Sequence, residues 1–214
     1  MSSAKAVQKR LYTELFPTEL SKSQKRRMEI LEGAIKAYAE VDFNHVSFDD
    51  IALPAKTSRR LVQHYFPDKG ELFSVTMKLI RAKYQSAAIT ALSAATDPSE
   101  QLTEYVRAAV RWTQTDPLHF RNWILYYLVC AQQITLRRLH EEMADVGAER
   151  IEALIRSVRT DVDIQQEDLH FAAKTIQRLI TGALIETSSE RTSPDTTKIQ
   201  NEVIRASLMI AMGI

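Results

Sequence analysis

Apolar residues recur along the chain at the three-and-four spacing of amphipathic helices. One such stripe runs from Leu102 to Thr113, another from Leu169 to Leu184, and a third from Ile199 to Ile210. Side chains three or four residues apart share one face of a helix, so each stripe predicts a helix with one buried face. Sustained alternation with the period of a β-strand is missing from the sequence, which predicts an all-α fold.

Capping residues followed by proline mark where several helices begin. An Asp or Ser side chain can cap a helix, and proline is suited to the first helical position. Three such pairs predict helix starts, at Asp97-Pro98, Asp116-Pro117 and Ser193-Pro194. The last two helices then cover about 165–189 and 194–213. Residues 135–160 form a further amphipathic segment, which we expect to be interrupted or relaxed near Gly147.

Residues 23–73 contain the most informative pattern in the chain. A clear apolar helix face, from Ile30 to Ala39, is followed by a capping sequence that starts at Ser47. The short helix after that cap must stop near Pro54, and a second one can begin around Ser58. Its period places Arg59, Arg60, Gln63 and His64 on one side and Val62 and Phe66 on the other. Two short helices with a tight turn, the second bearing long polar side chains, predict a helix-turn-helix motif.

Composition narrows the class of protein further. Only 5 of the 214 residues are Gly, which disfavours folds built on hairpins and phosphate loops. The single cysteine, Cys130, cannot form an internal disulfide and is typical of a reducing compartment. The longest apolar run, 123–131, is too short to span a bilayer, and the polar N-terminus lacks a signal peptide's apolar segment. We therefore expect a cytoplasmic protein without a membrane partner.

The near-neutral total charge hides a division. Residues 1–84 carry 15 Lys plus Arg against 10 Asp plus Glu, a net +5, whereas residues 85–214 carry 13 against 17, a net −4. Phosphate binding depends chiefly on Lys and Arg, so the basic portion favours a polyanionic partner there. A chance drift of surface charge is the alternative interpretation.

The helix-turn-helix stretch resembles the DNA-binding domain of the tetracycline-repressor (TetR) family. The resemblance covers about 44 residues without gaps and is carried by Ile30–Phe43, by Ser47–Ala52 and by His64–Phe73. It implies a three-helix N-terminal domain, a connecting fourth helix and a larger helical regulatory domain. It also implies a homodimeric, ligand-responsive transcriptional repressor that binds a palindromic operator in double-stranded DNA.

The turn of the motif departs from the family pattern. Where the family usually has Ala-Gly-Val-Ser, this chain has Ala55-Lys56-Thr57-Ser58. Lys56 must then adopt a left-handed backbone at a cost of about 1 kcal/mol, or the turn has another geometry. Pro54 removes a backbone donor and is expected to bias Leu53 away from the helical region.

The resemblance also assigns residues that contact DNA. Arg59, Arg60, Gln63 and His64 are expected to face base edges, and Ser47, Tyr65 and Lys69 to bind phosphates. With the turn included, the predicted set is Ser47, Lys56, Thr57, Ser58, Arg59, Arg60, Gln63, His64, Tyr65 and Lys69. Alternatives stay open for three of them: Ser47 as an ordinary cap, Tyr65 as a core aromatic and Arg60 as a solvated charge. Because Arg pairs bidentately with guanine, we expect a contacted G·C pair in each half-site.

Aromatic side chains gather in the middle of the chain. Two interpretations are open: walls for an apolar or aromatic ligand held between helices, and ordinary core packing. The predicted ligand-binding residues are Trp112, His119, Phe120, Trp123, Tyr127 and Gln177. The histidines lack metal-ligand or catalytic spacing, so the sequence predicts no metal site, no cofactor, no catalytic residues and no enzymatic activity.

These observations divide the chain into three expected parts. Residues 1–22 form a basic arm or a short helix, 23–68 the helix-turn-helix DNA-binding domain, and 69–214 a helical ligand-binding and dimerisation domain. Residues 165–213 are the expected homodimer surface, and Ala172, Ala173, Gly182 and Ala183 would permit close helix approach. The same stripes could instead build an intramolecular core. The predicted function is a repressor released from its operator by a small apolar or aromatic effector. The alternative is a DNA-bound helical scaffold regulated by a protein partner.

Overall fold

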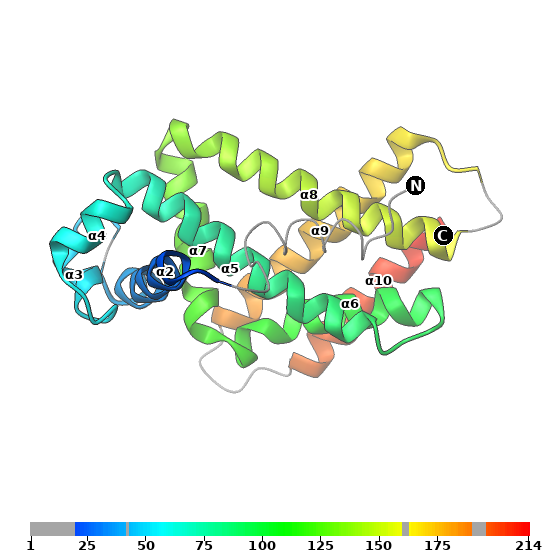
Figure 1. Cartoon of the computed structure of the whole chain (residues 1–214). Helices are drawn as coiled ribbons and strands as arrows, with labels where there is room; N and C mark the ends of the chain where they lie inside the picture. The colour runs from blue at the N-terminus through cyan, green and yellow to red at the C-terminus, as the bar shows by residue number, and fades with distance from the viewer. Residues whose placement is uncertain (1–19, 42, 160–162, 190–195) are drawn as a thin grey trace. The chain divides into compact units, whose positions relative to one another are not determined.

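The computed structural model describes residues 20–41, 43–159, 163–189 and 196–214, and these residues contain helices and no strand. Figure 1 shows the helices in chain order. They are α2 (Lys22–Glu40), α3 (Phe48–Ala52), α4 (Arg59–Tyr65), α5 (Lys69–Leu92), α6 (Pro98–Thr115), α7 (Pro117–Gln132), α8 (Ile134–Val158), α9 (Gln166–Ser189) and α10 (Thr196–Met212). The all-α prediction is confirmed.

Two of the three predicted helix starts are confirmed. Pro98 and Pro117 are the first residues of α6 and α7, and the Asp116 side chain accepts a hydrogen bond from the backbone N–H of His119. Ser193 and Pro194, like residues 1–19 of the predicted arm, lie outside the described residues. The expected interruption near Gly147 is wrong: α8 continues through this buried glycine, because the surrounding good helix formers outweigh one unfavourable residue.

The chain divides into two compact units. The described residues of the N-terminal unit are 20–41, 43–83 and 116–141, and those of the C-terminal unit are 84–115, 142–159, 163–189 and 196–214. The predicted functional boundaries at residues 22 and 68 stay a prediction, because compactness of packing does not test function.

The core of the N-terminal unit forms around α2. Its buried face includes Ile30, Ala34 and Ile35, each fully buried, as the apolar stripe predicts. An aromatic cluster covers its C-terminal end, where the Tyr38 and Phe73 ring centroids lie 5.3 Å apart and those of Phe43 and Phe73 4.6 Å apart. Both pairs adopt the edge-to-face arrangement that aromatic quadrupoles favour. The start of α5 is thereby fixed against α2.

Helix α7 also packs against α2 within this unit. The side chain of Asn122 is fully buried, and its amide donates to the backbone carbonyl of Ile35 at 2.9 Å and to that of Leu118 at 3.0 Å. A buried amide is costly unless it is hydrogen bonded, so these contacts favour one relative position of the two helices.

The C-terminal unit is built on mutual packing of α6, α9 and α10. Their buried faces meet through apolar side chains that include Val106, Ile176 and Val203. Polar contacts join the same helices: Gln114 donates to Thr196 Oγ1 at 2.5 Å, and Thr187 Oγ1 lies 3.5 Å from Thr113 Oγ1. The apolar stripes predicted for these three helices therefore supply a core within the chain.

A glycine lets α2 approach α3 and its following turn closely. A Cβ atom on Gly33 would lie 2.6 Å from Ala55 Cβ and 2.9 Å from both Ala55 N and Ile51 O. Two of these three atoms are backbone atoms, which cannot move without shifting the motif.

We expect Gly33→Ala to lower the free energy of unfolding by about 1–3 kcal/mol, because the added methyl group overpacks this contact. Chemical denaturation monitored by circular dichroism measures it. Thr90→Ala is the control: it places alanine at an exposed position within α5, where it should be stabilising by up to about 0.7 kcal/mol. Equal stability of the Gly33 variant and the natural chain would contradict the close approach.

Candidate nucleic-acid interface

Helix α3 starts with a capping box between Ser47 and Asp50. The Ser47 Oγ accepts from the backbone N–H of Asp50 at 3.3 Å, and Asp50 Oδ2 accepts from the Ser47 N–H at 2.7 Å and from its hydroxyl at 2.6 Å. These hydrogen bonds favour the ionised carboxylate, so they hold the pKa of Asp50 below its usual value of 3.8, and the charge of Lys69 acts in the same direction. The capping role of Ser47 is confirmed, and phosphate contact stays a prediction.

The turn after α3 contains a left-handed residue, Lys56, which is the first of the two geometries expected for this turn. Lys56 has φ 50°, its N–H donates to Leu53 O at 3.1 Å, and the Thr57 N–H donates to Ala52 O at 3.0 Å. This pair of hydrogen bonds is the Schellman motif, which satisfies carbonyls at a helix end and is usually completed by glycine. Lys56 thus occupies the position where the family usually has glycine.

The expectation for Leu53 is wrong. Its backbone stays in the right-handed helical region, with φ −60° and ψ −59°. Proline only disfavours that region for the preceding residue, and here the Leu53 N–H donates to Asp49 O at 3.1 Å while its carbonyl accepts from Lys56. The helical path therefore extends past Pro54 to the left-handed residue.

Helix α4 presents the two faces that its period predicts. Ser58 caps it by accepting from the Leu61 N–H at 3.3 Å, while Val62 and the following Phe66 are fully buried. The exposed residues are Arg59, Arg60, Gln63 and His64. Tyr65 is half-buried, and its hydroxyl accepts from Ser23 Oγ at 3.3 Å, so it is neither a core aromatic nor a freely solvated group.

One exposed arginine of α4 is tied to α3. Arg59 Nη1 donates to Asp49 Oδ2 at 3.0 Å across the turn. This pairing was missed from the sequence, because ten residues and a turn separate the partners and no helical spacing signals it. Lys69 is the first residue of α5, and its charge acts on Asp50 of α3. It is therefore not one of the exposed residues of α4.

Basic residues also precede the apolar face of α2. Arg26 pairs with Glu29 at 2.6 Å, and Arg27 lies 3.9 Å from Glu71 and 4.7 Å from the centre of the Phe66 ring. Arg27 therefore braces the end of α4 by a cation–π contact.

The six predicted ligand-binding residues are divided between the two units. Trp112 and Gln177 belong to the C-terminal unit, where Trp112 packs on Tyr84 with centroids 4.7 Å apart and Gln177 donates to Ala144 O at 3.2 Å. His119, Phe120, Trp123 and Tyr127 belong to the N-terminal unit, where the Trp123 and Tyr127 rings lie 4.8 Å apart. A ligand site formed by these residues stays a prediction.

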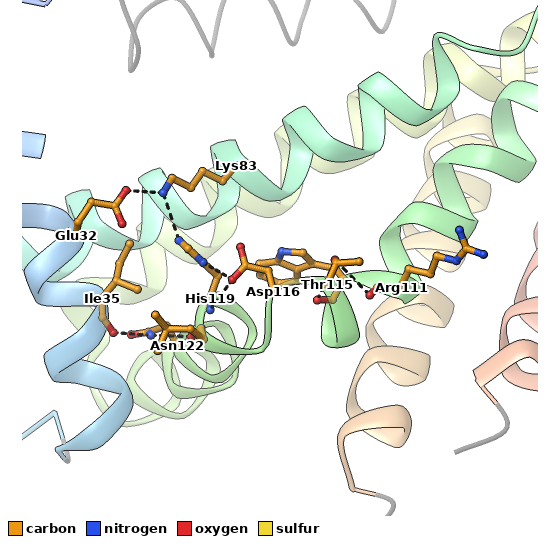
Figure 2. A network of polar contacts seen from close by, with 10 residues as sticks. Glu32, Ile35, Lys83, Arg111, Thr115, Asp116, His119 and Asn122 are labelled. Atoms are coloured by element: carbon orange, nitrogen blue, oxygen red, sulfur yellow. Dashed lines mark hydrogen bonds and ion pairs between the residues drawn. The ribbon is translucent and has the colours of Figure 1, made fainter. Parts of the chain in front are cut away.

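His119 takes part in a polar network that joins α2, α5 and α7 within the N-terminal unit (Figure 2). Its Nδ1 lies 2.5 Å from Asp116 Oδ1, and its Nε2 lies 3.5 Å from Lys83 Nζ, which also pairs with the Glu32 carboxylate. An ammonium group only donates, so Nε2 accepts and Nδ1–H donates to Asp116. Both ring nitrogens are thus engaged. The sequence predicted Asp116 only as a helix cap. Its hydrogen bond with the His119 ring follows from the same three-residue spacing as the cap.

The described part of the chain has neither a cluster of metal ligands nor a membrane-spanning helix. Its residues contain no group of three or more His, Cys, Asp or Glu side chains placed to hold a metal ion. None of its helices is long and apolar enough to cross a membrane.

Comparison with known proteins places this geometry in a family. Residues 30–76 match the family described as bacterial regulatory proteins, tetR family. The HTH-type transcriptional regulator BetI of Rhizobium meliloti (strain 1021) is 27% identical over 114 residues, which cover 53% of this chain and 56% of that protein. BetI of Serratia proteamaculans (strain 568) is 25% identical over 159 residues, 73% of this chain and 78% of that protein. In the first of these alignments the chain thus spans about half the length of its relative.

Solved structures share the fold at low sequence identity. A putative transcriptional regulator from Pseudomonas aeruginosa PAO1 has a TM-score of 0.76 at 15% identity, covering 94% of this chain and 97% of its own. One from Saccharomonospora viridis, in complex with choline, has a TM-score of 0.70 at 18% identity, covering 84% and 93%. The motif and these matches define a helix-turn-helix regulator fold, and the matched relatives are regulators, not enzymes. Residues 30–76, which contain the helix-turn-helix motif, are thus the part of the chain that matches the tetR family of bacterial regulatory proteins.

The capping box makes stability depend on pH with a definite sign. The pKa of Asp50 is lower in the folded chain, so its stabilisation is present above the usual value of 3.8 and is lost as the pH falls through the lower folded value. We expect Asp50→Asn to be less stable than the natural chain at about pH 6 and the difference to narrow at about pH 2. Urea denaturation at the two pH values measures it, and a difference that does not change with pH would contradict the ionised cap.

Proposed function

We propose that the chain is a DNA-binding transcriptional regulator that binds a palindromic operator as a homodimer and is released by a small apolar or aromatic effector. The observation that carries this proposal is the α4 surface. Arg59, Arg60 and Gln63 are exposed together on a helix whose opposite face is buried. Long polar side chains at the start of such a helix can reach base edges in the major groove.

In this proposal the interface has three sets of contacts. Arg59, Arg60, Gln63 and His64 face bases, and at least one arginine pairs with a guanine of each half-site. Ser47, Tyr65 and Lys69 bind phosphates on either side of the groove. The turn residues Lys56, Thr57 and Ser58 lie between α3 and α4. In the proposed complex they approach the sugar-phosphate backbone of the DNA. Ser47 must then bind phosphate while its hydroxyl also serves the cap of α3.

The proposed dimer surface is the exposed side of α9 and α10. Phe171 is 69% exposed and Ile185 46%, and helical spacing places both on one stripe with Gly182. Met209, Met212 and Ile214 are exposed apolar residues at the end of α10. Ala172, Ala173 and Ala183 are buried within their own chain, so of the small residues first considered only Gly182 lies open. Exposed apolar side chains on two helices of one unit favour an interface with a second copy.

The proposed effector acts by shifting a conformational equilibrium. A ligand that prefers one arrangement of the regulatory helices displaces the connecting helix α5, changes the spacing of the two recognition helices and so weakens operator binding. Within the N-terminal unit, the Asn122 and His119 contacts give α7 and α5 a direct connection to α2. Movement of α7 would therefore shift α2, the helix that supports α3 and α4.

The alternative is a DNA-bound helical scaffold regulated by a protein partner. In that case the aromatic cluster is a solid core, and regulation acts through another surface. Two surface hollows, of about 480 Å³ and 460 Å³, have charged linings, with Arg26, Glu29 and Lys56 in the first and Glu100, Glu104 and Arg107 in the second.

For the dimer surface, we expect Phe171→Glu combined with Ile185→Glu to produce monomers, because paired charges would be buried at the two-fold interface. Sedimentation would show half the mass, and operator affinity would fall at least about tenfold because two linked half-site contacts are lost. Thr90→Glu is the control: it adds one charge at an exposed position on α5, outside the proposed surface. A charged double variant that stays dimeric would contradict the surface.

For the function as a whole, the full chain should select one two-fold symmetric sequence from a random DNA pool. An effector that releases this operator must bind the free protein more tightly than the operator complex, by the same factor by which it weakens DNA binding. We expect this behaviour from at least one of a panel of apolar and aromatic compounds, with choline included because one structural neighbour holds it. Release of DNA by a folded protein partner, with every compound ineffective, would favour the scaffold instead.

A further inference from the structure

Asp49 lies in the first turn of α3, where a negative charge favours the N-terminal end of a helix. Its carboxylate also accepts from the Arg59 guanidinium at 3.0 Å, and both side chains are more than half exposed, at 62% and 57%. An exposed ion pair of this kind adds little to the stability of a fold. The helix terminus therefore accounts for an acid at this position, but not for its contact with Arg59 beside a surface expected to meet phosphates.

The pair restricts the side chain that begins the recognition helix. Arg59 is the first residue of α4, and the N-terminal residues of such a helix are the ones that contact base edges. A free arginine loses rotamer entropy when it is fixed on DNA. Because Asp49 already holds the guanidinium, part of this cost is met before binding.

The geometry leaves Arg59 able to read a base. A guanidinium has five N–H donors, and the contact with Asp49 uses one of them, on Nη1. Guanine presents two acceptors, O6 and N7, to a pair of parallel donors. The other effect of Asp49 is repulsive: its negative charge opposes nearby phosphates, and it competes with them for Arg59.

We propose that Asp49 is a specificity-determining residue, which aims Arg59 at a base edge and keeps it from binding phosphates at unrelated sequences. The proposal rests on the proposed DNA-binding function. It gives Asp49 two effects of opposite sign, a gain in affinity for the operator and a loss in affinity for other DNA. A residue with a purely structural role would not produce this combination.

The experiment compares two affinities for each variant of the full chain at one salt concentration. One is for the operator selected by the natural protein, and the other is for a duplex of the same length and scrambled sequence. We expect Asp49→Asn to bind the scrambled duplex more tightly and the operator more weakly, so that the ratio of the two affinities falls about tenfold. Replacing operator guanines by 7-deazaguanine, which lacks N7, should then weaken the natural protein more than the variant.

Two further variants separate the charge effect from the aiming of Arg59. Asp50→Asn removes one charge from the same helix, and its amide oxygen can still accept the Ser47 N–H. It should raise affinity for both duplexes alike and leave the ratio unchanged. Asp49→Glu keeps a carboxylate within reach of Arg59 and should restore most of the ratio. Once Arg59 is replaced by Gln, a further Asp49→Asn change should no longer lower the ratio.

The outcomes distinguish this proposal from the function on which it rests. If the natural chain selects no sequence, the DNA-binding function is wrong. If it selects an operator and Asp49→Asn, shown to be folded by circular dichroism, keeps the natural ratio, the role of Asp49 is wrong and the function stands. An Asp49→Asn variant with higher affinity for the operator would also overturn the proposal, because the pair would then only mask Arg59.

Discussion

The packing of two very short helices, α3 against α2 and α4 against α3, is the constraint on which the candidate interface depends. Isolated helices shorter than about 12–15 residues are marginal in water, and α3 and α4 have 5 and 7 residues. Each is held by a serine cap and by buried residues such as Ile51 and Val62. The close approach at Gly33 brings α2 near enough for this burial. With one face fixed in this way, the other face of α4 is available for polar side chains that do nothing for folding.

The turn between the two helices shows how the chain meets a backbone requirement without glycine. The left-handed residue of the Schellman motif is Lys56, which costs about 1 kcal/mol relative to glycine. In return, the turn carries a positive charge close to the proposed phosphate contacts. Lys56 therefore adds to the positive charge of residues 1–84 at a position where the family pattern has glycine, which has no side chain.

Local signals in the sequence predicted the helices and their caps, but not the polar contacts between helices. The helix starts at Pro98 and Pro117, the Ser47 cap and the two faces of α4 all follow from short spacings, and all are confirmed. Interactions between distant residues carry no such signal. The Arg59–Asp49 pair, the Lys83–His119 contact and the Asn122 contact with α2 depend on how helices pack. The predictions for Leu53 and Gly147 were wrong for a related reason. Hydrogen bonds around Leu53 and good helix formers around Gly147 outweighed the effect of one unfavourable residue.

The central claim is that α4 reads bases in the major groove, and methylation interference tests it most directly. Dimethyl sulfate adds a methyl group to guanine N7, which lies in that groove and is an acceptor for arginine. The account predicts that methylation of a guanine in each half-site prevents binding of the natural chain, at two positions separated by about one helical turn or a multiple of it. Binding that tolerates N7 methylation throughout the operator would contradict it.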